Sequence, residues 1–162
     1  MISRAHAALA RATRQGADCF AQYAWEEIAI EIAARALGMG SRARPKERCL
    51  PCAEARVTRV VRLIDAHPEW DYNLISLASE AKLSRYHFLR VFQEWTGLTP
   101  HQFVLRTRLR SAATRLIVDG MPVLHIALES GFGDVSNFNH AFRREFGMSP
   151  REYRMLYTRL AI

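Results

Sequence analysis

The sequence contains only three cysteines among its 162 residues, which limits its thiol chemistry. Cys49 and Cys52 form a C-x-x-C pair, and Cys19 stands alone nearer the start. A structural zinc site needs about four ligands, and no second C-x-x-C or H-x₃₋₅-H completes the set. A redox dithiol normally begins a helix that follows a strand, a context that we do not find. We expect an inert pair, with a thiol- or metal-responsive regulator as an alternative.

Other patterns are also absent. No apolar run approaches the roughly 18 residues of a transmembrane helix, so we expect no membrane partner. Residues 1–9 lack the apolar stretch of a secretory signal, which favours a cytoplasmic protein. The sequence contains no glycine-rich phosphate loop, nucleophile elbow or pair of catalytic carboxylates, so we expect neither an enzyme nor a cofactor.

Lysine is rare in the second part of the sequence, where arginine supplies nearly all of the positive charge. The formal net charge is +7, and residues 56–162 carry 15 basic and 10 acidic side chains. Lys82 is the only lysine among those 15. Arginine matches phosphate and the guanine edge with a planar fork, although a codon bias explains the composition equally well. The charge favours an anionic partner, nucleic acid before an anionic membrane.

No window alternates apolar and polar residues long enough to indicate a strand, so we predict an all-α protein. Residues 20–37 contain neither glycine nor proline and predict an amphipathic helix. Residues 38–48 are rich in glycine, proline and charge, as linkers are. Capping residues then predict further helices at 56–66, 74–82, 84–96, 99–119, 122–131, 134–147 and 149–158.

The second half of this helical array repeats the first. An offset of 49 aligns Leu77-Ala78 with Ile126-Ala127. After a one-residue insertion near Gly133 the offset becomes 50. It then aligns Phe88 with Phe138, Phe92 with Phe142, Gly97 with Gly147, Thr99-Pro100 with Ser149-Pro150, and Phe103 with Tyr153. Chance similarity would not keep these positions in order, so one supersecondary unit occurs twice.

Each copy consists of a short helix, a tight turn and a longer helix. In the second copy Ala127 precedes Gly131 by four residues, which is typical of a helix-turn-helix. The small residue lets the helices cross closely, and glycine permits a positive φ in the turn. The first copy keeps Ala78 but has Ala81 and Lys82 where the turn glycine would be. The longer helix of such a unit lies in the major groove, which predicts double-stranded DNA as partner.

Residues from about 57 to 157 resemble the DNA-binding domain of the AraC/XylS family of bacterial transcription regulators. The matching text is LASEAKLSRYHFLRVFQEWTGLTPHQFVLRTRLRSAATRL, followed by PVLHIALESGFGDVSNFNHAFRREFGMSPREYR. The resemblance implies two homeodomain-like helix-turn-helix subdomains joined by a long helix. The expected domains are a helical extension and linker at 1–55 and a DNA-binding domain at 56–162. Within the latter we place the first helix-turn-helix at 74–97, the linker helix at 99–119, the second helix-turn-helix at 122–147 and the last helix at 149–158.

The resemblance also implies which residues contact DNA. Arg90 is the leading candidate for base readout, because a bidentate arginine discriminates guanine by about 1–3 kcal/mol. Val135 and His140 stand where many relatives carry Gln and Arg, so the second helix would mainly bind phosphate. The base-facing set is Tyr86, Leu89, Arg90, Gln93, Val135, Ser136, Asn137 and His140. The phosphate-contacting set is Ser84, Arg85, Thr99, Arg143, Arg144 and Ser149.

Other side chains in these helices have a structural interpretation. Helical spacing directs Trp95 inward, and Arg115 can pair with Asp119 four residues later. The aromatic residues Phe88, Phe92, Phe138, Phe142, Phe146 and Tyr153 are expected in the core. Arg106, Arg108 and Arg110 on the long helix are expected to form a solvated face.

Residues 20–37 carry more apolar surface than one packed helix can bury, which favours a two-fold homodimer. Folding of this helix onto the DNA-binding domain would instead keep the protein monomeric. RNA polymerase is a further candidate partner of a regulator. An alternative function is a protein-interaction module that forms mixed dimers with a full-length relative.

Overall fold

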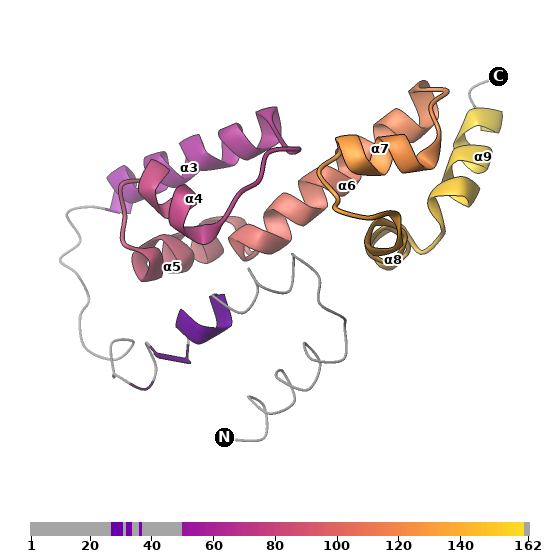
Figure 1. The fold of residues 1–162 in the computed structure, drawn as a ribbon. Helices are drawn as coiled ribbons and strands as arrows, with labels where there is room; N and C mark the ends of the chain where they lie inside the picture. Colours follow the sequence, from indigo (N-terminus) through magenta and orange to yellow (C-terminus); the bar gives the residue numbers. More distant parts are fainter. Residues whose placement is uncertain (1–26, 31, 34–35, 37–49, 161–162) are drawn as a thin grey trace. The chain divides into compact units, whose positions relative to one another are not determined.

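The computed structural model describes residues 27–30, 32–33, 36 and 50–160, and every regular element among them is a helix. The predicted all-α class is therefore confirmed. The helices are α3 (Leu50–Ala66), α4 (Leu74–Glu80), α5 (Arg85–Thr96), α6 (Pro100–Val118), α7 (Val123–Glu129), α8 (Val135–Phe146) and α9 (Pro150–Leu160) (Figure 1). None of the described helices is long and apolar enough to cross a membrane.

The start of the chain is described only in part. Residues 27–30, 32–33 and 36 are helical, and the rest of the expected helix at 20–37 and the linker at 38–48 lie outside the described residues. Helix α3 begins at Leu50 rather than at Arg56, and its face with Val57, Val60 and Ile64 is fully buried. The domain boundary at residue 55 stays a prediction.

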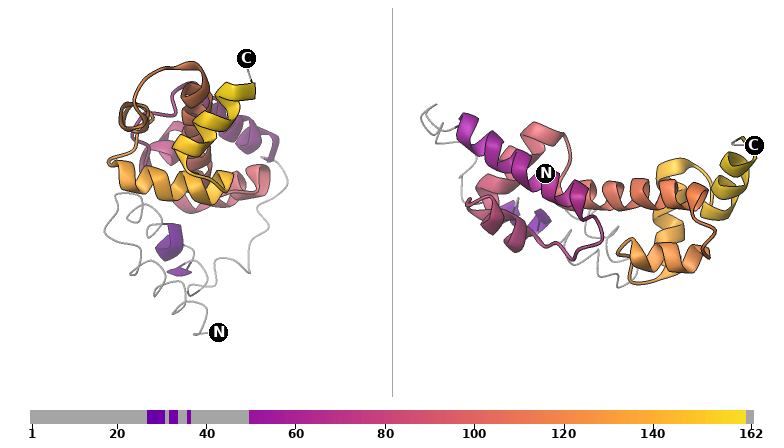
Figure 2. Two further views of the ribbon diagram at one scale, coloured as in Figure 1. Left: turned by 90° about the vertical axis from the view of Figure 1, so that its right-hand side faces the viewer. Right: turned by 90° about the horizontal axis from the view of Figure 1, so that it is seen from above.

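The chain separates into two compact units, each with one helix-turn-helix. Residues 73–101, with the described part of 1–54, form the unit that contains α4 and α5. Residues 55–72 and 102–160 form the unit that contains α7, α8 and α9. Helix α6 runs without a break from Pro100 to Val118 and belongs to the second unit from Gln102 onward (Figure 2).

Helices α5 and α8, the longer helix in each copy of the helix-turn-helix, begin and end alike. Each has 12 residues, and its N-cap, Ser84 or Asp134, accepts a hydrogen bond from the amide three residues later. Each ends at a glycine in the left-handed region, with φ of 72° at Gly97 and 75° at Gly147. The helix starts predicted at residues 84 and 134 are confirmed, and the repeat in the sequence is a repeat in backbone geometry.

The turns that precede these two helices also share one geometry. Lys82 has a φ of 53° and Gly131 a φ of 84°, at positions that the offset of 49 aligns. Glycine adopts this region without steric cost, whereas for lysine it costs roughly 1–2 kcal/mol. The first helix-turn-helix therefore contains backbone strain that the second avoids.

Aromatic side chains fill the core of each helix-turn-helix. The Phe88 and Phe92 rings lie 5.3 Å apart in α5, and the Phe138 and Phe142 rings lie 5.4 Å apart in α8. All four side chains are fully buried, as predicted. Tyr153 of α9 packs edge-on against Phe142 at 5.3 Å. These contacts fix which face of α5 and α8 turns inward.

Arg108 is buried with only 5% of its surface exposed, so its assignment to a solvated face is wrong. Its guanidinium donates to three backbone carbonyls: Nε to Pro68 at 2.8 Å, Nη1 to Gly131 at 2.8 Å and Nη2 to Trp70 at 2.7 Å. Hydrogen bonds from a charged donor are stronger than neutral ones. Arg108 therefore ties the segment after α3, and the turn before α8, to helix α6.

Replacing Gly131 by alanine should destabilise the protein more than the same change at Gly147. A Cβ at Gly131 would lie 2.9 Å from the Arg108 guanidinium and from the Glu69 carbonyl oxygen, in addition to the strain of a positive φ. Gly147 has a similar φ and open space around it, so Gly147→Ala reports strain alone, roughly 1–2 kcal/mol. Urea unfolding of both variants measures the difference. Equal losses would mean that the Arg108 contact yields without cost.

Candidate nucleic-acid interface

The start of helix α5 presents three of the predicted DNA-contacting residues. The Ser84 hydroxyl accepts a hydrogen bond from the His87 amide at 3.3 Å, which leaves its proton available to a phosphate. Ser84 and Arg85 are exposed and Tyr86 is half-buried. The first turn of α5 therefore combines a hydroxyl, a guanidinium and a phenol at the end of the helix that favours anions.

Arg90 lies one turn further along α5, and its side chain is 37% exposed. Its Nε lies 3.6 Å from a carboxylate oxygen of Glu94, which is itself largely exposed. An exposed pair of this kind contributes only about 0.2–1 kcal/mol, so it holds Arg90 loosely. Gln93 is also partly exposed. Arg90 can therefore leave Glu94 for a guanine edge at small cost.

Two expectations for α5 are wrong. Leu89 is only 4% exposed, so its side chain lies in the core and cannot face a base. It shares the inward face of α5 with Phe92, three residues later. Trp95, in the last turn of α5, is 53% exposed rather than inward.

Asn137, which we predicted to face a base, instead bonds to the N-cap of its own helix, α8. The Asn137 amide donates to a carboxylate oxygen of Asp134 at 2.9 Å, and Asn137 Nδ2 donates to the other at 2.6 Å. Reading a base with Asn137 would require breaking the second of these bonds. Ser136 and His140 are exposed and Val135 is half-buried.

One face of α8 is polar and cationic along its length. Its exposed residues recur at the spacing of a single helical face, and Asn139 is among them although our sequence interpretation did not include it. Its spacing, three residues after Ser136 and four before Arg143, could have identified it. A carboxamide at such a position can hydrogen-bond to adenine. The exposed residues of this face are Ser136, Asn139, His140, Arg143 and Arg144.

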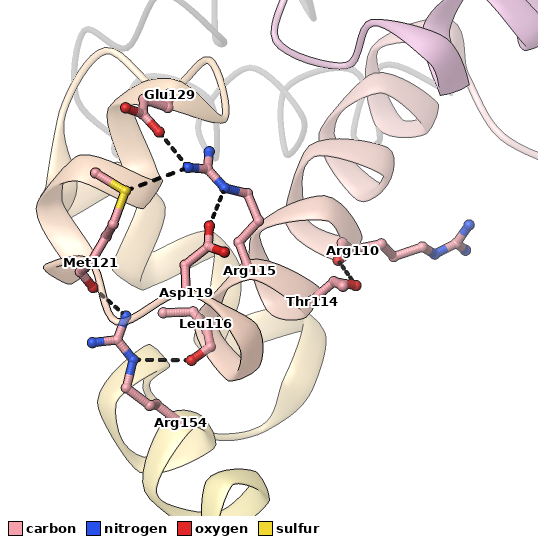
Figure 3. Close-up of polar contacts among 8 residues, drawn as sticks. All are labelled: Arg110, Thr114, Arg115, Leu116, Asp119, Met121, Glu129 and Arg154. Carbon is pink, nitrogen blue, oxygen red and sulfur yellow. Dashed lines mark hydrogen bonds and ion pairs between the residues drawn. The ribbon is translucent and has the colours of Figure 1, made fainter.

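A polar network joins the end of α6 to α7 (Figure 3). Arg115 Nε donates to Asp119 at 2.9 Å, which confirms the predicted pair, and Arg115 also binds the Glu129 carboxylate of α7. The bond to Glu129, and then that to Asp119, raises the pKa of the Arg115 guanidinium above its ordinary value. The network therefore stays charged and helps to fix α7.

Helix α9 is held by a second arginine in the same view (Figure 3). Arg154 donates to the carbonyl of Leu116 at 3.1 Å and to that of Met121 at 2.6 Å. Both acceptors lie at the end of α6 or in the turn that follows it. Since α9 also packs against α8, these bonds help to orient α8.

The N-terminus of α9 is occupied by a carboxylate from its own first turn. The Ser149 amide and hydroxyl each lie 2.7 Å from a carboxylate oxygen of Glu152. The bond from the Ser149 hydroxyl, and then that from its amide, lowers the pKa of the exposed Glu152 carboxyl. A DNA phosphate at Ser149 would have to displace this side chain.

The N-terminus of α6 is also occupied by a carboxylate, but this one comes from the start of the chain. The His101 amide donates to Glu27 Oε1 at 3.0 Å, and the Thr99 hydroxyl bonds to the same side chain. Glu27 is 8% exposed, and burial raises the pKa of its carboxyl although both hydrogen bonds oppose the shift.

No group of three or more His, Cys, Asp or Glu residues suited to a metal ion occurs in the described part of the chain. Cys52 is an exposed free thiol within α3, and Cys49 lies outside the described residues. The inert pair stays a prediction, with the thiol- or metal-responsive role as its alternative.

Similar sequences fall on the helix-turn-helix region. A family described as a helix-turn-helix domain matches residues 77–155. The regulator MtrA of Neisseria gonorrhoeae is 33% identical over 101 residues, which are 62% of this chain and 34% of that protein. The RCS-specific activator RclR of Escherichia coli is 36% identical over 106 residues, 65% of this chain and 37% of that one. The chain spans about a third of the length of the curated relatives it matches.

Solved structures agree with this assignment. The DNA-binding domain of the transcription factor AdpA, determined in complex with a target DNA, is 31% identical with a TM-score of 0.60; the match covers 62% of this chain and 91% of that domain. The chain belongs to the AraC/XylS family. An AraC-type regulator from Chromobacterium violaceum has a TM-score of 0.61 at 27% identity, over 64% of this chain and 93% of that one. The double helix-turn-helix of the AraC type is thus confirmed, and the family is one of regulators rather than of enzymes.

Replacing Leu89 by alanine should destabilise the AraC-type domain rather than change its base preference. Removing a buried leucine side chain costs about 2–5 kcal/mol. Gln93→Ala, at a partly exposed position of the same helix, should cost far less. Thermal unfolding and binding to a panel of substituted DNA sites measure the two properties. Wild-type stability with a changed preference at one base pair would return Leu89 to the interface.

Proposed function

We propose that the protein binds specific DNA sequences in the bacterial cytoplasm and regulates transcription, with α5 and α8 as recognition helices. The main support for this proposal is the repeated helix-turn-helix. Its helices α5 and α8 have the same length and the same kind of caps, and both expose polar faces. The complex of the AdpA domain with its target DNA supports the same role. The two helices would enter successive major-groove segments about one turn, or 34 Å, apart.

The side chains of the two recognition helices suit different contacts with DNA. In α5, Arg90 reads guanine, and Tyr86 and Gln93 contact neighbouring base edges. In α8, Arg143 and Arg144 bind phosphate in the last turn, where they also stabilise the helix dipole. Ser136, Asn139 and His140 form the base-facing part of α8. Most of the discrimination between sequences would then come from α5.

The start of the chain would fold onto the unit that contains α4 and α5. The bond between Glu27 and the His101 amide supports this arrangement over a dimer through residues 20–37. Ile32, which is exposed, leaves part of the helix available to a second copy. RNA polymerase is the further partner that we propose for a transcription regulator.

A mobility-shift titration with the promoter of the protein's own gene tests DNA binding. We expect a complex that resists random competitor DNA and weakens steeply with salt, with a slope of log K against log[salt] of about −0.9 for each phosphate neutralised. A flat salt dependence would contradict phosphate binding by arginine. The absence of any complex would favour the protein-interaction module.

Arg90→Ala should weaken binding to the specific site by about 1–3 kcal/mol and relax the preference at one base pair. Arg62→Ala, which removes an exposed arginine of α3, is the matched control for charge. Competition with sites substituted at single positions identifies the affected base pair. A loss of equal size on specific and random DNA would instead assign Arg90 to a phosphate.

A further inference from the structure

The contact between Glu27 and helix α6 joins parts of the chain that are far apart in sequence. Residues 27 and 101 are separated by 74 positions, yet the Glu27 carboxylate accepts the His101 amide at 3.0 Å. Both residues belong to the same compact unit, which also contains the first helix-turn-helix. The Thr99 hydroxyl bonds to the same carboxylate.

The start of a helix favours an anion for two reasons. Its first amides lack acceptors within the helix, and its dipole is positive at this end. Pro100 has no amide hydrogen, so the His101 amide is the first donor of α6. A DNA phosphate uses the same donors as a carboxylate does. Glu27 therefore occupies the place where Thr99 and the start of α6 would bind a phosphate.

The internal repeat shows that this arrangement is specific to α6. In α9 the equivalent place is filled by Glu152, which lies three residues after Ser149 and is exposed. The offset of 50 aligns Glu152 with Gln102, so α6 has no carboxylate of its own at that position. Glu27, from outside the helix-turn-helix, supplies one instead. The carboxylate at α9 therefore belongs to the first turn of the helix itself, whereas the carboxylate at α6 comes from a residue 74 positions away.

Burial makes this contact easier to displace. Glu27 is 8% exposed, and a carboxylate that loses its water depends on its hydrogen bonds for compensation. Burial raises the pKa of the Glu27 carboxyl, and this effect is larger than the opposing effect of the hydrogen bonds from His101 and Thr99. A phosphate held by the rest of a DNA duplex is a stronger competitor for the same donors.

We propose that Glu27 is an intramolecular competitor of a DNA phosphate at the N-terminus of α6, so that the N-terminal segment lowers the affinity of the protein for DNA. The inference rests on the proposed DNA-binding function and on Thr99 as a phosphate contact. Binding of DNA expels the Glu27 carboxylate into water and places a backbone phosphate oxygen on the His101 amide and the Thr99 hydroxyl.

Three variants of the full chain test the competition. Glu27→Ala removes the carboxylate, and Glu27→Asp keeps the charge but is too short to reach the His101 amide. Glu69→Ala is the control, because it makes the same change in net charge at an exposed residue that bonds to neither Thr99 nor His101. Dissociation constants for a duplex from the promoter of the protein's own gene are measured over a range of salt concentrations. Urea unfolding establishes that each variant is folded.

We expect Glu27→Ala to bind about fivefold more tightly, the effect of one charge at a helix terminus. Its salt slope should stay close to that of the unmodified protein, because both complexes contain the same phosphate contacts once Glu27 has been displaced. Glu27→Asp should also bind more tightly, which separates the contact from the charge and supplies a second variant if Glu27→Ala does not fold.

Unchanged or weaker binding by both Glu27 variants would overturn the proposal and make Glu27 a structural cap of α6. An equal gain with Glu69→Ala would also overturn it, since net charge alone would then explain the effect. Binding by Glu27→Ala where the unmodified protein does not bind would support it strongly. If the unmodified protein binds and the variants match it, the competition fails while DNA binding stands. If no variant binds DNA, the proposed function itself fails.

Discussion

The orientation of each recognition helix depends on one left-handed residue in the turn that precedes it. Lys82 and Gly131 have the same backbone conformation, but their surroundings differ. At Gly131 the Arg108 guanidinium and the Glu69 carbonyl leave no room for a Cβ. Two independent constraints therefore require glycine at this turn: the positive φ and the lack of space for a Cβ. At Lys82 the side chain is exposed, so the first turn accepts a lysine and its strain.

Periodic and local features of this protein could be predicted from the sequence because they depend on near neighbours. The caps at Ser84 and Asp134 and the glycines at Gly97 and Gly147 follow from backbone hydrogen bonding within one turn. The buried aromatic residues follow from helical spacing. The repeat itself was visible because the two copies keep the same structural positions in order. The candidate interface could be located in the same way, since it lies on the faces opposite these aromatic residues.

The errors arise where tertiary contacts override residue type. Residue type predicts a solvated Arg108, because arginine is rarely buried, yet Arg108 occupies a position where carbonyls of distant segments meet. Its spacing contained a signal, since Val104, Arg108, Ala112 and Leu116 lie four residues apart and all are buried. The family resemblance predicts Leu89 at the interface, whereas its apolar character predicts the buried position that it occupies. Glu27 had no signal at all, because its partner on α6 lies 74 residues away.

The two helix ends that favour anions show how a duplicated unit can acquire different control at each copy. At α9 the capping box from Ser149 to Glu152 is local, so its carboxylate remains with the helix whatever the rest of the chain does. At α6 the carboxylate arrives from residue 27, so its presence depends on the position of the N-terminal segment. Any event that moves that segment changes the electrostatics of the first helix-turn-helix and leaves the capping of α9 unchanged. Because Arg90 and the proposed base readout belong to the first copy, the proposed competition by Glu27 would affect the half of the domain to which we assign discrimination between DNA sequences.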